Sequence, residues 1–231
     1  MLFYQPQKGY CFNSDSMFLY DFISSYSPKG RLLDVGCGVG VIGLLLARDF
    51  NIDLTMVEKQ DVMAKLAQRN IKVNKIDAEL IKSDFLEFNA TKPFDFIVSN
   101  PPFYHPDVIQ SQNSHINACR YNTHLPIEPF FKKVASLLSS RGHFIFCYDA
   151  SQLPQLLESL NKVALRAEEL RMVHPKTDRA AKLVMIHARK NSKARLKVLP
   201  PFIVFEGDKY STEAQEIFKK ARTHTIKCQI S

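Results

Sequence analysis

The 231-residue chain contains no tryptophan, and its five cysteines are scattered. They are odd in number and never form a Cys-x-x-Cys pair, which excludes a disulfide framework and a zinc-finger type of site. The seven histidines likewise lack the spacing of metal ligands, and we therefore expect no metal in this protein. The cysteines are Cys11, Cys37, Cys119, Cys147 and Cys228.

A long hydrophobic run is also missing. The longest nearly uncharged apolar stretch, residues 35–47, is interrupted by glycines and falls short of the roughly 20 residues that span a bilayer. The N-terminus lacks the apolar region and the cleavage site of a secretory signal. We therefore expect a cytoplasmic protein without a membrane helix. Its 45% hydrophobic and 23% charged residues are typical of a globular chain.

Acidic residues are scarce in the last third of the chain. Residues 1–150 carry 15 basic and 15 acidic side chains, whereas residues 151–231 carry 16 basic and 8 acidic ones, so the whole net charge of +8 lies there. Lysine and arginine side chains gain affinity for nucleic acids by releasing counterions from the phosphates. The asymmetry predicts a surface that binds a polyanion, and a basic surface without a partner is the alternative.

From residue 31 onward, short β-branched or aliphatic runs alternate with longer helical patterns, which is typical of βαβ units. We expect an α/β, Rossmann-like fold with seven strands in a mostly parallel sheet and helices on both faces. The expected strands lie near 31–35, 53–57, 78–82, 94–99, 143–148, 165–172 and 183–189. The expected helices lie near 41–49, 61–74, 128–139 and 151–162.

We expect one domain over residues 1–231. Residues 1–28 form a cap segment, whose apolar positions predict a helix against the sheet, and residues 29–190 form the core. Residues 191–231 form a basic C-terminal part. It contains an expected strand near 196–205, a turn at 206–208 and a helix over about 212–222 that Ser211 or Thr212 caps.

A glycine-rich turn, DVGCGVGVIG, follows the first expected strand. Gly36, Gly38 and Gly40 let the backbone approach a ligand closely at the carboxyl end of a parallel strand, where α/β proteins bind nucleotides. No lysine follows the last glycine, which excludes a P-loop, whereas a dinucleotide site stays open. Two details favour S-adenosylmethionine. Gly36 is an added glycine, and the carboxylate of Asp34 can meet the cationic amino group of a methionine moiety.

Two acidic residues follow the next strands. Glu58 ends the second strand, 20 residues after Gly38, where a carboxylate accepts hydrogen bonds from a ribose diol. NAD and S-adenosylmethionine both carry that diol. Asp84, after the third strand, can accept the amino group of an adenine while Phe85 packs on the ring. For either carboxylate the alternative is a loop or capping role.

The motif Asn100-Pro101-Pro102-Phe103 directly follows the fourth strand. Consecutive prolines end a strand and fix the backbone. Such a turn can hold the Asn100 side-chain oxygen and the Pro101 carbonyl where both accept hydrogen bonds from one NH₂ group, with Phe103 stacked on the attached ring. Because the lone pair of such an amine is delocalised, two acceptors that pull the nitrogen toward a tetrahedral geometry make it reactive. The motif predicts transfer of a methyl group to a planar nitrogen.

Two further segments are candidates for binding RNA. The sequence between Tyr104 and Leu125 is polar and without pattern, which predicts a loop over the site, and Arg120 and Tyr121 in it can hold a phosphate or a base. Residues 171–197 contain nine basic side chains and one acidic side chain. We expect this segment to contact RNA phosphates. Its candidate contacts include Lys176, Arg179 and Lys182.

Residues 34–40 together with residues 100–103 resemble the motifs of the class I S-adenosylmethionine-dependent methyltransferases, in the small-domain branch. Members of this branch act on adenine N6, guanine N2 or glutamine N5. Within it, the chain is most similar to bacterial enzymes that N6-methylate the adenine beside the anticodon of a valine tRNA. Three further segments carry this resemblance, which covers most of the chain: FYQPQKGYCFNSDS at 3–16, ACRY at 118–121 and VHPKTDR at 173–179.

The resemblance implies S-adenosylmethionine as the cofactor and tRNA as the partner. It also implies that the N-terminal segment helps to close the cofactor pocket, which adds Asp15 to the candidate residues. Two positions depart from the pattern of relatives. Phe103 replaces a tyrosine, and either ring can stack. Cys11 replaces a common arginine, which weakens any role assigned to that position.

Several other activities compete with this interpretation. A glutamine N5 methyltransferase shares the Asn-Pro-Pro turn but usually carries an extra N-terminal helical domain. A guanine N2 methyltransferase of rRNA shares Asn-Pro-Pro-Phe but usually continues with histidine, where this chain has Tyr104. A nicotinamide-dependent oxidoreductase and an RNA-binding protein without activity are the alternatives from other classes. The oligomeric state does not follow from the sequence.

Overall fold

The computed structural model describes residues 1–7, 11–101 and 126–229. Four candidate residues, Pro102, Phe103, Arg120 and Tyr121, lie outside this part of the chain. Among the described residues, none of the helices has both the length and the apolar composition of a membrane span.

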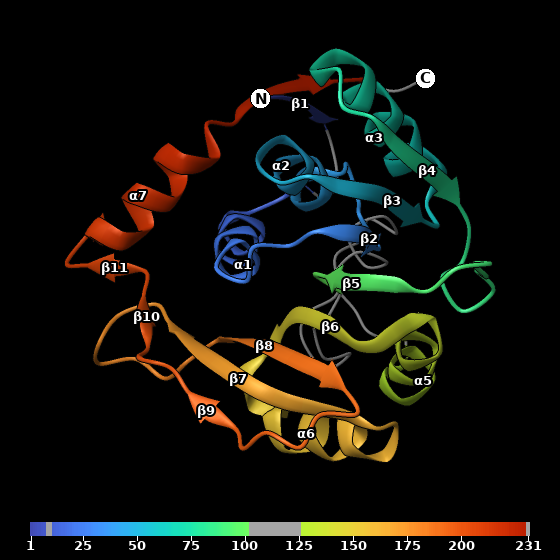
Figure 1. Cartoon of the computed structure of the whole chain (residues 1–231). Helices are drawn as coiled ribbons and strands as arrows, with labels where there is room; N and C mark the ends of the chain where they lie inside the picture. Colours follow the sequence, from blue (N-terminus) through green and yellow to red (C-terminus); the bar gives the residue numbers. More distant parts are fainter. Residues whose placement is uncertain (8–10, 102–125, 230–231) are drawn as a thin grey trace.

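A nine-stranded sheet forms the centre of the molecule (Figure 1). The strand order is β10-β7-β8-β6-β5-β2-β3-β4, and β9 also pairs with β7. The strands are β2 (Gly30–Val35), β3 (Ile52–Glu58), β4 (Ala78–Lys82), β5 (Phe94–Ser99), β6 (Leu138–Asp149), β7 (Leu165–His174), β8 (Leu183–Lys190), β9 (Lys197–Val198) and β10 (Phe202–Ile203). All seven expected strands are present, and β9 and β10 are short additions at one edge.

Most neighbouring strands run parallel, as the sequence predicts. β2 to β6 form a parallel block, whereas β8 runs antiparallel to both β6 and β7. From β2 the chain passes outward through β3 to β4, and then returns to β5 on the other side of β2. Open α/β sheets bind ligands at such a reversal, beyond the carboxyl ends of the strands. The topology therefore predicts a ligand site at the carboxyl ends of β2 and β5.

Helices cover both faces of the sheet. The helix α1 packs with α2 and α7 on one side, and α5 packs with α6 on the other (Figure 1). The helices are α1 (Ser14–Ser24), α2 (Val41–Asp49), α3 (Asp61–Asn74), α5 (Ile127–Leu137), α6 (Leu153–Lys162) and α7 (Thr212–Ala221). They confirm the helices expected from the sequence, with differences of a residue or two at their ends.

The apolar run after the glycine turn becomes helix α2. Its residues from Val41 to Leu46 are all buried, because the helix lies between the sheet and α1. A helix that is apolar on all sides needs such cover. The run is therefore part of the hydrophobic core.

The two ends of the chain meet in a small parallel sheet of β1 (Leu2–Pro6) and β13 (His224–Cys228) (Figure 1). The sequence analysis predicted neither strand. Both are short, and each finds its partner at the opposite end of the chain. Strand β1 also packs against α3, so the N-terminal segment is held from two sides.

The C-terminal part differs from one expectation. The continuous strand expected near 196–205 is wrong, since this stretch is divided among β9, β10 and β11 (Phe205–Glu206). Pro200 and Pro201 interrupt it because proline has no N–H to donate to a ladder. The expected turn is confirmed between β11 and β12 (Lys209–Tyr210), as is the helix α7, whose N-terminal cap is the Ser211 hydroxyl accepting from the Ala214 N–H at 3.2 Å.

Candidate functional site

The carboxyl ends of β2 and β5 lie side by side at the reversal of the sheet. Val35 pairs with Ser99 in the register of the two strands, and the Ser99 hydroxyl donates to the Val35 carbonyl at 2.9 Å. Gly36 and Asn100 therefore leave the sheet at the same place. The two motifs that the sequence separates by more than sixty residues are brought together here.

The glycine turn leaves open space above its backbone. Gly36, Gly38 and Gly40 all have positive φ angles, of 65°, 57° and 85°. A Cβ atom added at Gly36 or Gly38 would meet no other atom within 4 Å, whereas one at Gly40 would meet Leu44 and Met56. The first two glycines thus border a hollow, and the third allows close packing on the core.

Asp34 is buried at the base of this turn. Its Oδ2 accepts a hydrogen bond of 2.9 Å from the Gly43 N–H, in the first turn of α2. Burial raises the pKa of Asp34 to about 7, against the opposing effect of the Gly43 hydrogen bond and with a smaller contribution from the nearby Glu58. A cationic group placed in the hollow would favour the ionised carboxylate.

Glu58, at the end of β3, is also buried and holds the other side of the turn. Its carboxylate accepts from the Gly38 N–H at 2.9 Å and from the Gln60 N–H at 2.7 Å. Burial raises the pKa of Glu58, and these backbone hydrogen bonds oppose the increase. The carboxylate is fixed in direction, with one oxygen on the glycine turn and the other on the backbone that follows β3.

The structure separates the next two candidates from the hollow. The carboxylate of Asp84 accepts from the Lys59 ammonium at 2.6 Å and from the Leu86 N–H at 2.9 Å, and the Lys59 hydrogen bond holds the pKa of Asp84 below its usual value. Phe85 is 5% exposed and packs edge-on against Phe130 at 5.4 Å. The Phe85 ring therefore belongs to the hydrophobic core, and its packing on a ligand ring stays a prediction.

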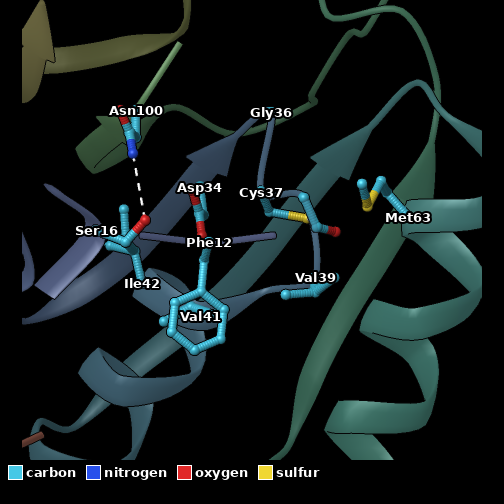
Figure 2. Close-up of a pocket in the computed structure, with 11 residues that line it drawn as sticks. Phe12, Ser16, Asp34, Gly36, Cys37, Val39, Val41, Ile42, Met63 and Asn100 are labelled. Atoms are coloured by element: carbon cyan, nitrogen blue, oxygen red, sulfur yellow. Dashed lines mark hydrogen bonds between the residues drawn. The ribbon is translucent and has the colours of Figure 1, made fainter. Parts of the chain in front are cut away.

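The side chain of Asn100 is oriented by two partners. Its Nδ2 lies 3.3 Å from the Ser16 hydroxyl of α1 (Figure 2). Its Oδ1 accepts from the Cys147 thiol of β6 at 2.9 Å. Burial raises the pKa of the Cys147 thiol well above its usual value, so the thiol remains a donor. The amide is thus fixed with its oxygen and nitrogen in known directions.

A pocket joins the glycine turn, Asn100 and the N-terminal segment (Figure 2). Sequence reasoning identified Asp34, Gly36, Gly38 and Asn100 among its lining residues. It missed the apolar wall and the contribution of α1, because these residues carry no motif of their own. The missed lining residues are Phe12, Ser16, Cys37, Val39, Val41, Ile42 and Met63.

Asp15 lies next to this pocket, in the first turn of α1. Its Oδ2 accepts from the Asn13 side chain at 2.7 Å, and burial raises its pKa. It is near enough to Cys147 to contribute to the raised pKa of that thiol. The N-terminal segment therefore brings a carboxylate beside the partners of Asn100.

Asn70 of α3 was also missed, and it connects the N-terminal strand to the glycine turn. Its side chain accepts from the Tyr4 N–H at 2.8 Å and donates to the carbonyls of Tyr4 at 3.1 Å and Val39 at 2.9 Å. The residue is fully buried. All of its hydrogen-bonding atoms are used to hold two backbone segments in place.

We expect Asn70→Ala to lower the free energy of unfolding by about 2–4 kcal/mol, because it leaves Tyr4 and Val39 backbone groups without their partners. Urea denaturation measures this loss. Gln68→Ala, an exposed position on the same helix, is the matched control and should change stability little. Equal stability of the two variants would contradict the role given to Asn70.

The tertiary structure divides the basic segment 171–197 between two edges of the sheet. Lys176, Arg179 and Lys182 lie between β7 and β8, at the edge where β6 ends, and the Lys182 carbonyl accepts from the Ala150 N–H at 3.2 Å. Arg189, Lys190 and Lys193 lie at the opposite edge, where β8 ends. Lys197 of β9 pairs with Glu169 of β7. The contact of this segment with RNA phosphates stays a prediction, and the fold presents its cations at more than one place.

Two of the side chains between β7 and β8 have acidic partners. Lys176 forms an ion pair with Asp208 at 3.4 Å, and Arg179 lies 3.9 Å from Asp178. All these groups are well exposed, so the pairs are weak and compete with solvent. Within the described ranges, no three or more His, Cys, Asp or Glu side chains form a group that could hold a metal ion.

Comparisons with known proteins agree with this geometry. A sequence model of the family described as "Methyltransferase small domain" matches residues 12–171. A tRNA1(Val) (adenine(37)-N6)-methyltransferase from Bacteroides thetaiotaomicron is 34% identical over 125 residues, which cover 52% of each chain. A ribosomal RNA small subunit methyltransferase C from Pasteurella multocida is 39% identical over 77 residues, which cover 33% of this chain and 23% of that one. The chain thus spans about half, or less, of the length of these relatives.

Among solved structures, one from Agrobacterium tumefaciens described as a predicted O-methyltransferase superimposes with a TM-score of 0.69. The superposition covers 91% of this chain and 98% of that one, at 16% sequence identity. This likeness confirms the expected Rossmann-like fold of class I methyltransferases.

Proposed function

The chain belongs to the methyltransferase small-domain family, and we propose that it methylates the N6 amine of an adenine in tRNA with S-adenosylmethionine. The observation that carries this proposal is that the glycine turn and Asn100 line the same pocket. One motif fits the methyl donor and the other fits a planar amine. Their adjacency is what a transfer between the two requires.

The residues around the glycine turn fit S-adenosylmethionine. Gly36 and Gly38 border space that any larger side chain would fill. The buried Asp34 would hold the amino group of the methionine moiety, and Glu58 would accept hydrogen bonds from the ribose diol. The Asp84 carboxylate, whose oxygens accept from Lys59 and from the Leu86 N–H, keeps lone pairs with which it would accept the adenine amine.

The chemistry assigned to this chain is positioning of the target amine. When bound, S-adenosylmethionine supplies an electrophilic sulfonium methyl group. The Asn100 oxygen and the Pro101 carbonyl would accept the two N–H groups of the amine and draw its nitrogen toward a tetrahedral geometry. This withdraws the lone pair from conjugation with the ring and makes it available for attack. Such orientation is effective without a strong base, since well-oriented groups reach effective molarities of about 10⁵–10⁸ M in favourable cases.

In this scheme the Asn100 oxygen accepts from two donors, the Cys147 thiol and the substrate amine. It already donates to the Asn100 oxygen at 2.9 Å, and that oxygen has a second lone pair for the substrate amine. The Ser16 hydroxyl accepts from the Asn100 nitrogen at 3.3 Å and so engages one of its two N–H groups. Together, the two contacts favour the orientation in which the amide accepts.

Adenine in tRNA is favoured by the relative that acts on tRNA1(Val) and by basic side chains at the pocket edge of the sheet. A guanine amine of ribosomal RNA is the second candidate, because the ribosomal RNA methyltransferase is 39% identical over its shorter match. Both substrates present an aryl amine that Asn100 can hold.

Transfer of a labelled methyl group to unmodified tRNA tests the proposal. Nuclease digestion and mass spectrometry should then identify N6-methyladenosine. Label in N2-methylguanosine of ribosomal RNA would favour the second candidate. Label in a protein glutamine, or no transfer to either RNA, would reject the proposed substrate.

The affinity for S-adenosylmethionine should depend on the ionisation of Asp34. The pKa of about 7 in the free protein means that the carboxyl is protonated below neutral pH, while the cationic ligand requires the carboxylate. Affinity should therefore increase with pH up to about 7 and then level off, with a loss of about tenfold one unit below the pKa. Calorimetry between acidic and neutral pH measures this dependence.

Asp34→Asn keeps an acceptor for the Gly43 N–H but removes the charge, and should bind weakly with little dependence on pH. Asp53→Asn, an exposed position on β3, is the control and should retain the wild-type profile. A profile that persists in Asp34→Asn would assign the titration to another group.

A further inference from the structure

A second hollow lies at the edge of the sheet opposite the glycine turn. It is formed where β6 begins and β8 ends, and four cationic side chains and one acidic one line it. The cations are Arg141, Arg189, Lys190 and Lys193, and the acid is Glu168. The methyl-transfer chemistry does not use these residues.

Two of the cations are held in place by backbone carbonyls. Arg189 donates from Nε and Nη2 to the Arg141 carbonyl at 3.1 and 2.9 Å, and Lys190 donates to the Leu138 carbonyl at 2.9 Å. These bonds fix the side chains without neutralising them. The positive charge is thus built into the hollow, and a ligand need not order these two side chains.

The other two cations remain available. Arg141 and Lys193 are exposed, and neither side chain forms a hydrogen bond or ion pair with the described residues. Glu168 is already engaged by the Ser192 hydroxyl. The hollow therefore has an excess of positive charge, with two unpaired donors beside two that backbone carbonyls hold. This combination suits a phosphate group, which accepts several charged hydrogen bonds.

The length of β8 separates this hollow from the edge of the sheet at which β5 ends and Asn100 follows. Strand β8 runs from Leu183, beside Lys182, to Lys190, and its seven steps of about 3.3 Å span about 23 Å. A free nucleotide held at Asn100 cannot reach it. A folded RNA can extend over that length, with its phosphates facing the basic groups at both ends of the strand.

We propose that this hollow binds a backbone phosphate of the RNA substrate, at the end of β8 that lies about 23 Å along the strand from Leu183. The inference rests on the proposed function, because it requires an RNA substrate. It identifies a contact that positions the RNA without reading its sequence. Arg141 and Lys193 donate hydrogen bonds to the phosphate, and Arg189 and Lys190 contribute positive charge from fixed positions.

The test compares methyl transfer to an unmodified tRNA transcript by the intact chain and by Arg141→Gln/Lys193→Gln over a series of salt concentrations. We expect kcat at saturating tRNA to be unchanged. KM should rise about tenfold at roughly 0.1 M salt, and the plot of log(kcat/KM) against log salt should become shallower by about one. The dissociation constant for S-adenosylmethionine should not change, which also shows that the variant is folded.

Lys72→Gln/Lys75→Gln is the matched control. It removes the same charge from two exposed positions, one in the last turn of α3 and one directly after it. Helix α3 packs against β4, at the other end of the strand order. The inference is overturned if both double variants alter the salt dependence equally, or if Arg141→Gln/Lys193→Gln keeps the wild-type KM and slope. Absence of methyl transfer by the intact chain to any RNA would instead reject the proposed function, and this inference with it.

Discussion

Asn100→Ala is expected to lower kcat for methyl transfer by about 10²- to 10³-fold, the loss seen when one oriented hydrogen-bonding group is removed from a reaction centre. The variant removes the side-chain oxygen that accepts from the target amine and leaves only the Pro101 carbonyl. Because the interaction matters for the orientation of the amine, kcat and kcat/KM should fall together. Single-turnover transfer to tRNA measures the effect.

The binding of S-adenosylmethionine separates this loss from damage to the pocket. Its dissociation constant should stay within a few-fold of the wild-type value, since Asp34 and Glu58 are untouched. Asn89→Ala, an exposed asparagine before β5, should retain full activity. Full activity of Asn100→Ala would show that the amide does not position the substrate.

Glu58→Ala should weaken the binding of S-adenosylmethionine by about a hundredfold, because the ribose diol loses a charged acceptor whose hydrogen bonds contribute roughly 1.5–3 kcal/mol. The same change leaves the Gly38 and Gln60 N–H groups without the partners that they have at 2.9 and 2.7 Å. The glycine turn loses its support, so the free energy of unfolding should also decrease. Calorimetry and urea denaturation measure the two effects.

Glu58→Gln distinguishes the two causes. It keeps one acceptor oxygen for the backbone and loses the charge. We therefore expect Glu58→Gln to be more stable than Glu58→Ala, and to bind S-adenosylmethionine with an affinity between those of the wild type and Glu58→Ala. Glu79→Ala, exposed on the neighbouring strand β4, is the control for loss of a carboxylate. Wild-type affinity in Glu58→Ala would place the ribose elsewhere.

The Asn100 amide depends on three segments that are distant in the sequence. Its backbone follows β5, its Oδ1 partner Cys147 lies on β6, and its Nδ2 partner Ser16 lies on α1. The segment bearing Ser16 follows β1, which is fixed by Asn70 and by pairing with β13. Changes at the C-terminal strand can therefore reach the pocket through the packing of the N-terminal segment.

The sequence by itself determined the elements whose signals are local. Alternating apolar runs predicted the seven main strands and the principal helices, because a strand or helix is recognisable from the spacing of neighbouring side chains. The positions of Asp34, Glu58 and Asn100 at the ends of strands followed in the same way, since each stands directly after a buried run. Parallel strands place such ends at one edge of the sheet.

The tertiary structure alone decided which of these groups meet. It placed Phe85 in the core, paired β1 with β13, and divided one basic segment between two edges because β8 runs against its neighbours. It also gave Asn100 the partners Ser16 and Cys147. Contacts of this kind depend on strand order and on packing between distant segments, and the spacing of residues along one chain does not specify either.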